Sequence, residues 1–387
     1  MAVRFKHPAT IRSIASPHQL ILPLLIAVAM VCSACKPSVK RTVRRREAPA
    51  QHGNILRLFA RAIERAGGEG VWIKSRDLRL SSAEHKVTDP TVEVILTARA
   101  RPEVLEAIRR QAESLRIRIR PASTLSANAT SEVVIGSSGR RLFNFRLVEV
   151  PRILQAALII DDLGQNLTAA HELVELNYPL TFSIMPRVPY ARETAEMAHW
   201  SGREVMLHLP MQPRPSSHAG VSPNEIRTGM SQGEVERIVE QDLNDVPFVA
   251  GVNNHMGSQA TTNPELMESV MAVLASRHLY FIDSRTTADT IALDVARQMG
   301  VPAFYRSVFL DDSRDVNYTL GQLRQFCDVV KKQGAAIAIG HPYPTTLAAL
   351  ARFLPEFDRE GIKLVPASRL ARSPEFARIN PPHPPRL

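Results

Sequence analysis

Hydrophobic positions change their spacing near the middle of the chain. From about residue 156 onward, short apolar runs alternate with segments in which apolar residues recur at helical spacing. The short runs predict strands at 156–162, 180–186, 204–210, 248–255, 279–283, 303–311, 335–341 and 363–367. Strands that alternate with helices indicate parallel strands joined by crossover helices. Seven or eight such units predict a closed or distorted (β/α) barrel over residues 151–372.

Residues 51–150 follow a different pattern. Amphipathic helices are predicted at 55–66, before Gly67-Gly68, and at 102–115, where a Pro stands near the start. Strand-like segments are expected at 70–74, 91–97, 116–120, 132–135 and 142–150. This mixture predicts a small α+β domain. It contains no evident catalytic constellation, and we expect it to act as a spacer or to bind a partner.

Residues 1–35 have the features of an export signal. Basic residues precede an apolar run at 20–31, which is too short for a comfortable membrane span. Ser33-Ala34-Cys35 resembles the end of a bacterial lipoprotein signal, although Cys32 stands where Leu is usual. Lipidation at Cys35, an uncleaved anchor and plain secretion are left as alternatives. All three predict a location outside the cytoplasm, in the periplasm or cell envelope, and the first two predict membrane attachment.

The net charge of +10 comes mostly from the start of the chain, because residues 1–50 hold nine Lys/Arg and one acid. Removing these from the totals of 48 and 38 leaves 39 basic and 37 acidic residues in the remainder. The folded part is therefore nearly neutral, and we expect no nucleic-acid partner. Residues 36–50 are predicted to form a basic linker and 373–387 a disordered tail, Pro-rich from Asn380 onward.

Acidic and histidine side chains fall at the ends of the predicted barrel strands. They are Asp161, Asp162, His208, His255, Asp283, Asp311 and His341. The carboxyl ends of parallel barrel strands converge on one face, which is where such folds keep their active sites. One such residue would usually cap a helix or fix a loop. This many at equivalent positions predict a catalytic site.

Imidazole and carboxylate groups without an available Cys suit a divalent metal ion that keeps one position open for water. The ion would lower the pKa of that water and polarise a carbonyl group. A second carboxylate could then accept a proton, and a histidine could protonate the leaving group. This division of work would explain the adjacent Asp161 and Asp162. Zinc is the favoured ion, with cobalt and nickel as alternatives.

Several short motifs in this half of the chain resemble the NodB-type polysaccharide deacetylases, and within them the divergent, YibQ-like group. Ile-Ile-Asp-Asp-Leu-Gly at 159–164 is similar to the first motif of that superfamily. The others lie at 181–186, 208–213, 251–258, 281–287, 308–312 and 339–342. The resemblance runs from Ala156 to about Leu370. It implies the deacetylase type of barrel and hydrolysis of acetyl groups from an acetylated polysaccharide or a peptidoglycan-type glycan.

The resemblance also implies roles for single residues. Asp161 matches the general base and Asp162 a metal ligand, and His341 matches the histidine that serves as general acid. His208 matches the first position of a His-x-x-x-His motif that supplies two further ligands. The second position holds Gln212, and amide oxygen is a poor zinc ligand.

His255 is our candidate to complete the ligand set in place of Gln212. Asp283 and Arg285 lie where the family keeps residues that orient the catalytic pair, although a plain ion pair is an equal alternative. Asp311, which ends a neighbouring strand, is a further candidate for orienting groups in the site.

Two other functions compete with the hydrolase. A catalytically degenerate envelope protein that binds glycan or a protein partner is favoured by Gln212. Hydrolysis of a phosphoester fits the ligand types, but only Arg285 and Arg306 could clamp a phosphate. The presence of both Asp161 and His341 favours the hydrolase, because binding alone needs neither a base nor an acid.

Overall fold

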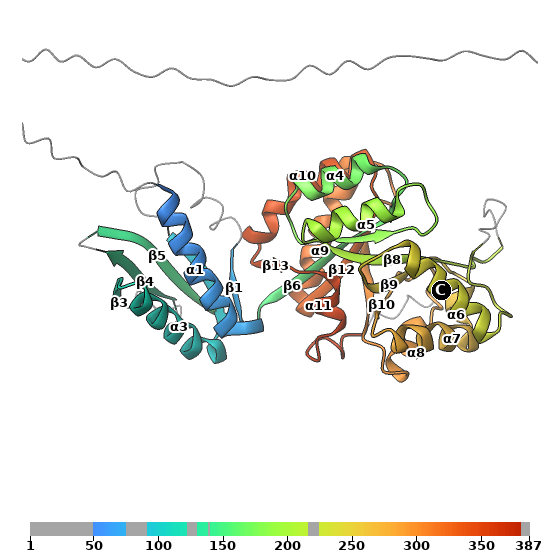
Figure 1. Ribbon diagram of the computed structural model, residues 1–387, viewed down its shortest axis with the longest axis horizontal. Coiled ribbons are helices and arrows are strands. Elements are labelled where there is room, and N and C mark those ends of the chain that lie inside the picture. Colours follow the sequence, from blue (N-terminus) through green and yellow to red (C-terminus); the bar gives the residue numbers. More distant parts are fainter. Residues whose placement is uncertain (1–48, 75–90, 122–129, 138–139, 216–223, 381–387) are drawn as a thin grey trace, which may run out of the picture. The chain divides into compact units, whose positions relative to one another are not determined.

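The computed structural model describes residues 49–74, 91–121, 130–137, 140–215 and 224–380 (Figure 1). The predicted export signal and nearly all of the basic linker lie outside these ranges, so both stay predictions. None of the helices within the described ranges is long and apolar enough to cross a membrane.

Seven parallel strands close into a barrel. They are β6 (Leu154–Leu163), β7 (Thr181–Ile184), β8 (Glu204–Met211), β9 (Val249–Met256), β10 (Tyr280–Asp283), β11 (Ala303–Phe309) and β12 (Ala335–Gly340). Each strand pairs with the next, and β12 pairs with β6 to close the ring. The predicted (β/α) barrel is confirmed.

The barrel is distorted at β6. This strand pairs along one edge with β12, so its other edge must serve both β7 and a short eighth strand, β13 (Ile362–Leu364). β13 takes the start of that edge, and β7 pairs farther along it. The apolar run of β6 from Ala156 to Ile160 is buried, as expected for a strand covered on both faces.

All but the last of the helices connect successive strands and lie around the outside of the barrel, and the last follows β13 (Figure 1). They are α4 (Leu167–Glu175), α5 (Ala191–Trp200), α6 (Gln232–Asp245), α7 (Pro264–Ser276), α8 (Ala292–Gln298), α9 (Val316–Gln333), α10 (Pro344–Arg359) and α11 (Ala367–Ala371). Ser231 and Glu234 form a capping box at the start of α6, which satisfies two otherwise unpaired backbone N–H groups.

The segment before the barrel forms a separate five-stranded sheet in the order β1-β2-β5-β4-β3. Its strands are β1 (Val71–Ile73), β2 (Thr91–Thr97), β3 (Arg118–Pro121), β4 (Thr130–Ser137) and β5 (Arg140–Val150). Helices α1 (Pro49–Gly67) and α3 (Arg101–Ser114) share an apolar core with it. The α+β arrangement agrees with the sequence analysis, and its role as a spacer or partner-binding module stays a prediction.

The disordered tail was predicted to begin at residue 373, and this start is too early. Residues 373–380 pack on the barrel, where Phe376 is buried and the Tyr305 hydroxyl donates a hydrogen bond to the backbone oxygen of Asn380. The Pro-rich composition of the last residues led to the prediction of disorder. Phe376 nevertheless belongs to the core of the barrel, and Ile379 packs against that core. Residues 381–387 lie outside the described part of the chain.

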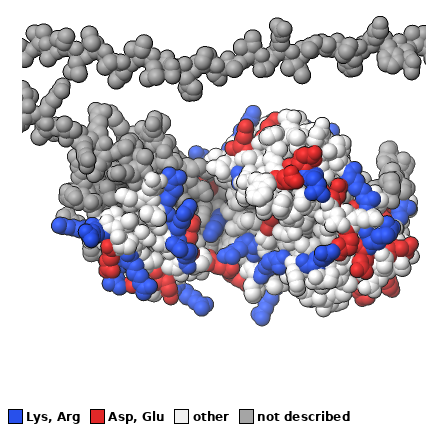
Figure 2. Space-filling model, viewed as in Figure 1, with Lys and Arg blue, Asp and Glu red and all other residues white. Residues whose placement is uncertain are grey.

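Lys and Arg side chains are interspersed with Asp and Glu side chains over the face of the barrel drawn in Figure 2. No single sign of charge dominates this face, so its long-range electrostatic field is weak. The clustered His and Asp residues at the strand ends therefore indicate the position of a catalytic site better than the surface charge does.

Candidate active site

The backbone at the end of β6 brings two consecutive aspartates to one site. Successive residues of a regular strand point to opposite faces. Here the register with β7 shifts between Ile160 and Leu163, and Asp162 has a left-handed φ of 56°. Consequently both carboxylates lie near the Nε2 atom of His208, at 3.6 Å for Asp161 Oδ2 and 3.3 Å for Asp162 Oδ1. Asp is among the few residues that adopt this conformation readily.

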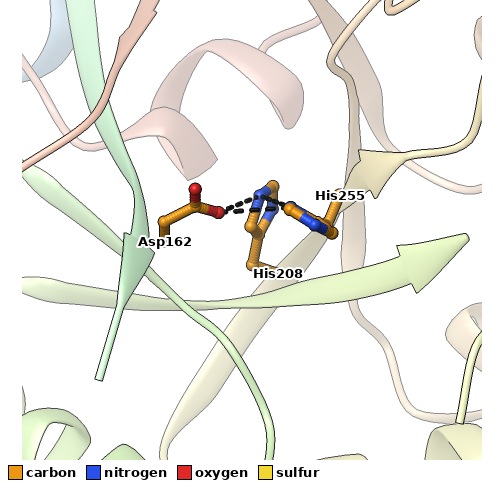
Figure 3. Close-up of side chains that lie close together, drawn as sticks. All are labelled: Asp162, His208 and His255. Atoms are coloured by element: carbon orange, nitrogen blue, oxygen red, sulfur yellow. Dashed lines mark hydrogen bonds and ion pairs between the residues drawn. The ribbon is translucent and has the colours of Figure 1, made fainter. Parts of the chain in front are cut away.

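Three side chains from β6, β8 and β9 converge at the mouth of the barrel (Figure 3). Asp162 Oδ1 lies 3.2 Å from His255 Nδ1, and His255 Nδ1 lies 3.1 Å from His208 Nε2. Asp162 Oδ1 is buried, and no group of the described residues donates a well-formed hydrogen bond to it. A buried carboxylate oxygen facing two imidazole nitrogens is a donor set that suits zinc.

The charges around this cluster favour a cation. Burial alone would raise the pKa of Asp162, but the adjacent His208 and His255 side chains lower that pKa far below its ordinary value. Burial likewise acts to lower the pKa of His208, yet the charges of Asp161 and Asp162 outweigh it and raise that pKa. Both shifts show that positive charge is stabilised here, whether it is carried by a proton or by a metal ion.

A second group holds His341 beside the cluster. Its Nε2 atom lies 3.8 Å from Asp162 Oδ2, while its Nδ1 atom lies 3.0 Å from Asp311 Oδ1. The other oxygen of Asp311 accepts hydrogen bonds from the backbone N–H of His341 and from the Thr346 hydroxyl. Burial tends to lower the pKa of His341, but the hydrogen bond to Asp311 and the nearby carboxylates raise it. The imidazole is therefore oriented, and its protonated form is favoured.

The side chain of Gln212, the residue after β8, is hydrogen-bonded to the loop residue Thr228. Its Oε1 atom accepts hydrogen bonds from the backbone N–H and the hydroxyl of Thr228, both at 2.9 Å. Its backbone oxygen accepts from Gln259 and Ala260. The possible ligand atoms of Asp162, His208 and His255 all lie within 4.8 Å of one another, whereas the Gln212 amide oxygen is held by Thr228.

Asp283 and Arg285 do not form a side-chain ion pair that the structure records. Asp283 is buried and accepts hydrogen bonds from the Arg285 backbone N–H and the Thr290 hydroxyl, so it shapes the loop after β10. Arg306 donates to the backbone oxygens of Ser284 and Arg285. Burial lowers the pKa of Arg306, which the charge of Asp161 opposes.

Sequence reasoning missed Asn253, the residue of β9 two positions before His255. Its Nδ2 group donates to Asp161 Oδ1 at 2.8 Å, and its Oδ1 atom lies 2.9 Å from His208 Nδ1. The Ser183 hydroxyl of β7 donates to the same Oδ1 atom at 2.7 Å. The available signal was a polar pair, Asn253-Asn254, directly after the apolar start of a predicted strand.

Comparison with known proteins finds a family model and two similar sequences. The model, described as divergent polysaccharide deacetylase, matches residues 158–371. The uncharacterized protein YibQ of Escherichia coli K12 is 38% identical over 226 residues, which cover 58% of this chain and 70% of YibQ. An uncharacterized protein of Haemophilus influenzae is 36% identical over 228 residues, which cover 59% of this chain and 79% of that protein.

A solved structure shares the fold of the barrel. The crystal structure of uncharacterized protein ATU2773 from Agrobacterium tumefaciens C58 matches with a TM-score of 0.54 and 20% identity. The match covers 57% of this chain and 89% of that chain. At this level of identity the likeness establishes the common fold.

Proposed function

The chain belongs to the divergent polysaccharide deacetylase family, and on that premise we propose that it is a metal-dependent hydrolase that removes acetyl groups from a polysaccharide. The observation that carries the proposal is the meeting of Asp162, His208 and His255 beside a separate carboxylate, Asp161, and an oriented imidazole, His341. These are the parts that hydrolysis of an amide or ester requires.

The three clustered residues fit a divalent ion, most simply zinc. The fit rests on the buried Asp162 Oδ1 atom, which otherwise lacks a hydrogen-bond donor among the described residues, and on the two imidazole nitrogens that face it. When bound, such an ion supplies a Lewis acid that polarises the scissile carbonyl and lowers the pKa of water.

In this proposal Asp161 acts as general base. Its Oδ1 atom accepts a hydrogen bond from Asn253, which leaves Oδ2 on the side of His208 to receive a proton. A water molecule that attacks the acetyl carbonyl forms the new C–O bond and gives its proton to this oxygen.

In the same proposal His341 acts as general acid. Because Asp311 holds its Nδ1 atom, the Nε2 atom faces the cluster and donates its proton to the leaving nitrogen or oxygen as the acetyl bond breaks. The products are acetate and a free amine or hydroxyl group, so atoms and protons balance.

The substrate we propose is an acetylated glycan of the cell envelope, such as one of the peptidoglycan type. The N-terminal export signal predicted from residues 1–35 supports this location. Attachment to the membrane through that segment is part of the same proposal.

Acetate release from a panel of N- and O-acetylated glycans tests the proposal, with zinc supplied to the purified chain. We expect release by the native chain and a loss of about 10²- to 10⁴-fold in Asp161→Asn, the range typical of general acid–base catalysis. Asp312→Asn, a change of the same type at an exposed site next to Asp311, serves as control. A zinc-loaded chain that binds these glycans but releases no acetate would support the degenerate binding protein instead.

A further inference from the structure

Asn253 is fully buried and contacts side chains from three other strands of the barrel. Its amide reaches Asp161 on β6, Ser183 on β7 and His208 on β8. Two of these neighbours are the candidate base and a candidate metal ligand. A buried amide that is hydrogen-bonded to both groups can orient them, because each of its hydrogen bonds has a defined direction.

We propose that Asn253 is a positioning residue that fixes the proton of His208 on Nδ1, keeps the Nε2 lone pair free for a metal ion, and orients Asp161 as the base. This inference deepens the proposed function and rests on it. It assigns to one side chain the relative placement of the base and a ligand.

The direction of each hydrogen bond follows from its partners. An ionised Asp161 carboxylate can only accept, so the Nδ2 group of Asn253 faces Asp161 and the Oδ1 atom points the other way. An amide oxygen can only accept, and therefore the nearby His208 Nδ1 atom must carry the proton that it donates. In a neutral imidazole the other nitrogen, Nε2, then holds the lone pair.

Ser183 secures this orientation. Its hydroxyl donates to the same Asn253 Oδ1 atom at 2.7 Å, so both lone pairs of that oxygen are used. Turning the amide over would place its oxygen against the Asp161 carboxylate. It would also leave buried polar groups without hydrogen-bond partners, which destabilises the turned amide.

The next residue, Asn254, provides a matched control. It is equally buried, but among the described residues its amide bonds to backbone groups alone, the oxygen of Met256 and the N–H of Ser284. Asn254 therefore supports the loops after β9 and β10 without contact to Asp161 or His208 in the described hydrogen bonds. Loss of either Asn removes one buried amide, whereas only Asn253 joins the base to the ligand.

The test compares Asn253→Ala with Asn254→Ala in the full-length, metal-free chain labelled with ¹⁵N-histidine. Two-bond ¹⁵N–¹H spectra report which imidazole nitrogen carries the proton, and His208→Gln identifies the signal. The spectra are recorded at a pH above the raised pKa of His208, where its imidazole is neutral, and there we expect the Nδ1–H form in the native chain and in Asn254→Ala. In Asn253→Ala we expect a shift toward the Nε2–H form, with zinc binding about 10- to 100-fold weaker, the usual effect of losing such a partner.

A second variant, Asn253→Asp, keeps the side-chain volume and the acceptor for His208 but removes the donor to Asp161. We expect it to retain the Nδ1–H form of His208 and to lower kcat with KM unchanged. An Nε2–H form of His208 in the native chain, or equal changes in both alanine variants, would overturn the inference. Because the spectra need neither metal nor substrate, they distinguish this result from failure of the proposed hydrolase.

Discussion

Asp162 Oδ1 and His255 Nδ1 lie 3.2 Å apart, although they come from β6 and β9, which two other strands separate in the barrel. Closure of the barrel therefore creates this pair, which no single β-α-β unit contains. Asp162 and His255 are also the two residues that complete the candidate ligand set with His208.

The first prediction concerns zinc content. We expect about one equivalent of zinc in the native chain, because three donor atoms converge on one point. Asp162→Asn and His255→Gln should each weaken zinc binding at least ~100-fold, beyond the effect of losing an outer partner. Asn is chosen at 162 because it also tolerates the left-handed φ. Competition with a coloured chelator measures the affinity.

The exposed His278 supplies a control for this prediction, since His278→Gln removes an imidazole far from the cluster in sequence and should leave zinc binding unchanged. A folded native chain that takes up no zinc, even when zinc is supplied, would rule out the metal-dependent mechanism.

The second prediction concerns the acid. Asp311→Asn should lower the rate of acetate release about 10²- to 10⁴-fold, because the amide can present N–H to His341 Nδ1 and no longer favours the protonated imidazole. Thr346→Val, which removes one hydrogen bond to the same carboxylate, should have a smaller effect. Rates are measured with zinc at saturation. Equal rates for Asp311→Asn and the exposed Asp312→Asn would contradict the assigned role of Asp311.

The third prediction concerns packing between β9 and β10. A Cβ atom on Gly251 would lie 2.4–2.5 Å from ring atoms of the buried Tyr280. Gly251→Ala should therefore lower the free energy of unfolding by about 1–3 kcal/mol. Gly321→Ala is the control. It lies inside α9, where the new methyl group meets no described atom within 4 Å beyond its own helix backbone and chain neighbours, and it should add about 0.5–1 kcal/mol. Urea denaturation measures both, and equal stabilities would disprove the packing argument.

The fourth prediction concerns pH. Burial raises the pKa of Asp242 from 3.8 to about 6, against the opposing charge of Arg187. A carboxyl group whose pKa is raised in the folded state stabilises that state fully at pH values below its pKa in the unfolded chain. This stabilisation is lost as pH rises from about 4 to about 6. Asp242→Asn, which mimics the protonated form, should gain stability relative to the native chain across this window, by at most about 3 kcal/mol.

Thermal unfolding at several pH values between 4 and 8 measures this difference. The gain should reach a plateau above about pH 6, where Asp242 is ionised in both folded and unfolded chains. Asp328→Asn, at an exposed position of α9, should show no such pH-dependent gain. A constant difference for Asp242→Asn at all pH values would contradict the prediction.

The sequence by itself determined the barrel and the face that carries the site. Apolar runs are local patterns, and most of them, like 156–160, lead into Asp or His. They locate the strands and their carboxyl ends without any knowledge of contacts. The same patterns selected Asp161, Asp162, His208, His255 and His341, which the structure brings together at the barrel mouth.

Only the tertiary structure decided how these residues are arranged. It directs Gln212 to Thr228, lets both aspartates face His208 through a shift in strand register, and joins the base to a ligand through Asn253. These relationships depend on register between strands that are far apart in the chain. The polar pair Asn253-Asn254 is visible in the sequence, but the strand register in the closed barrel decides which of the two contacts Asp161.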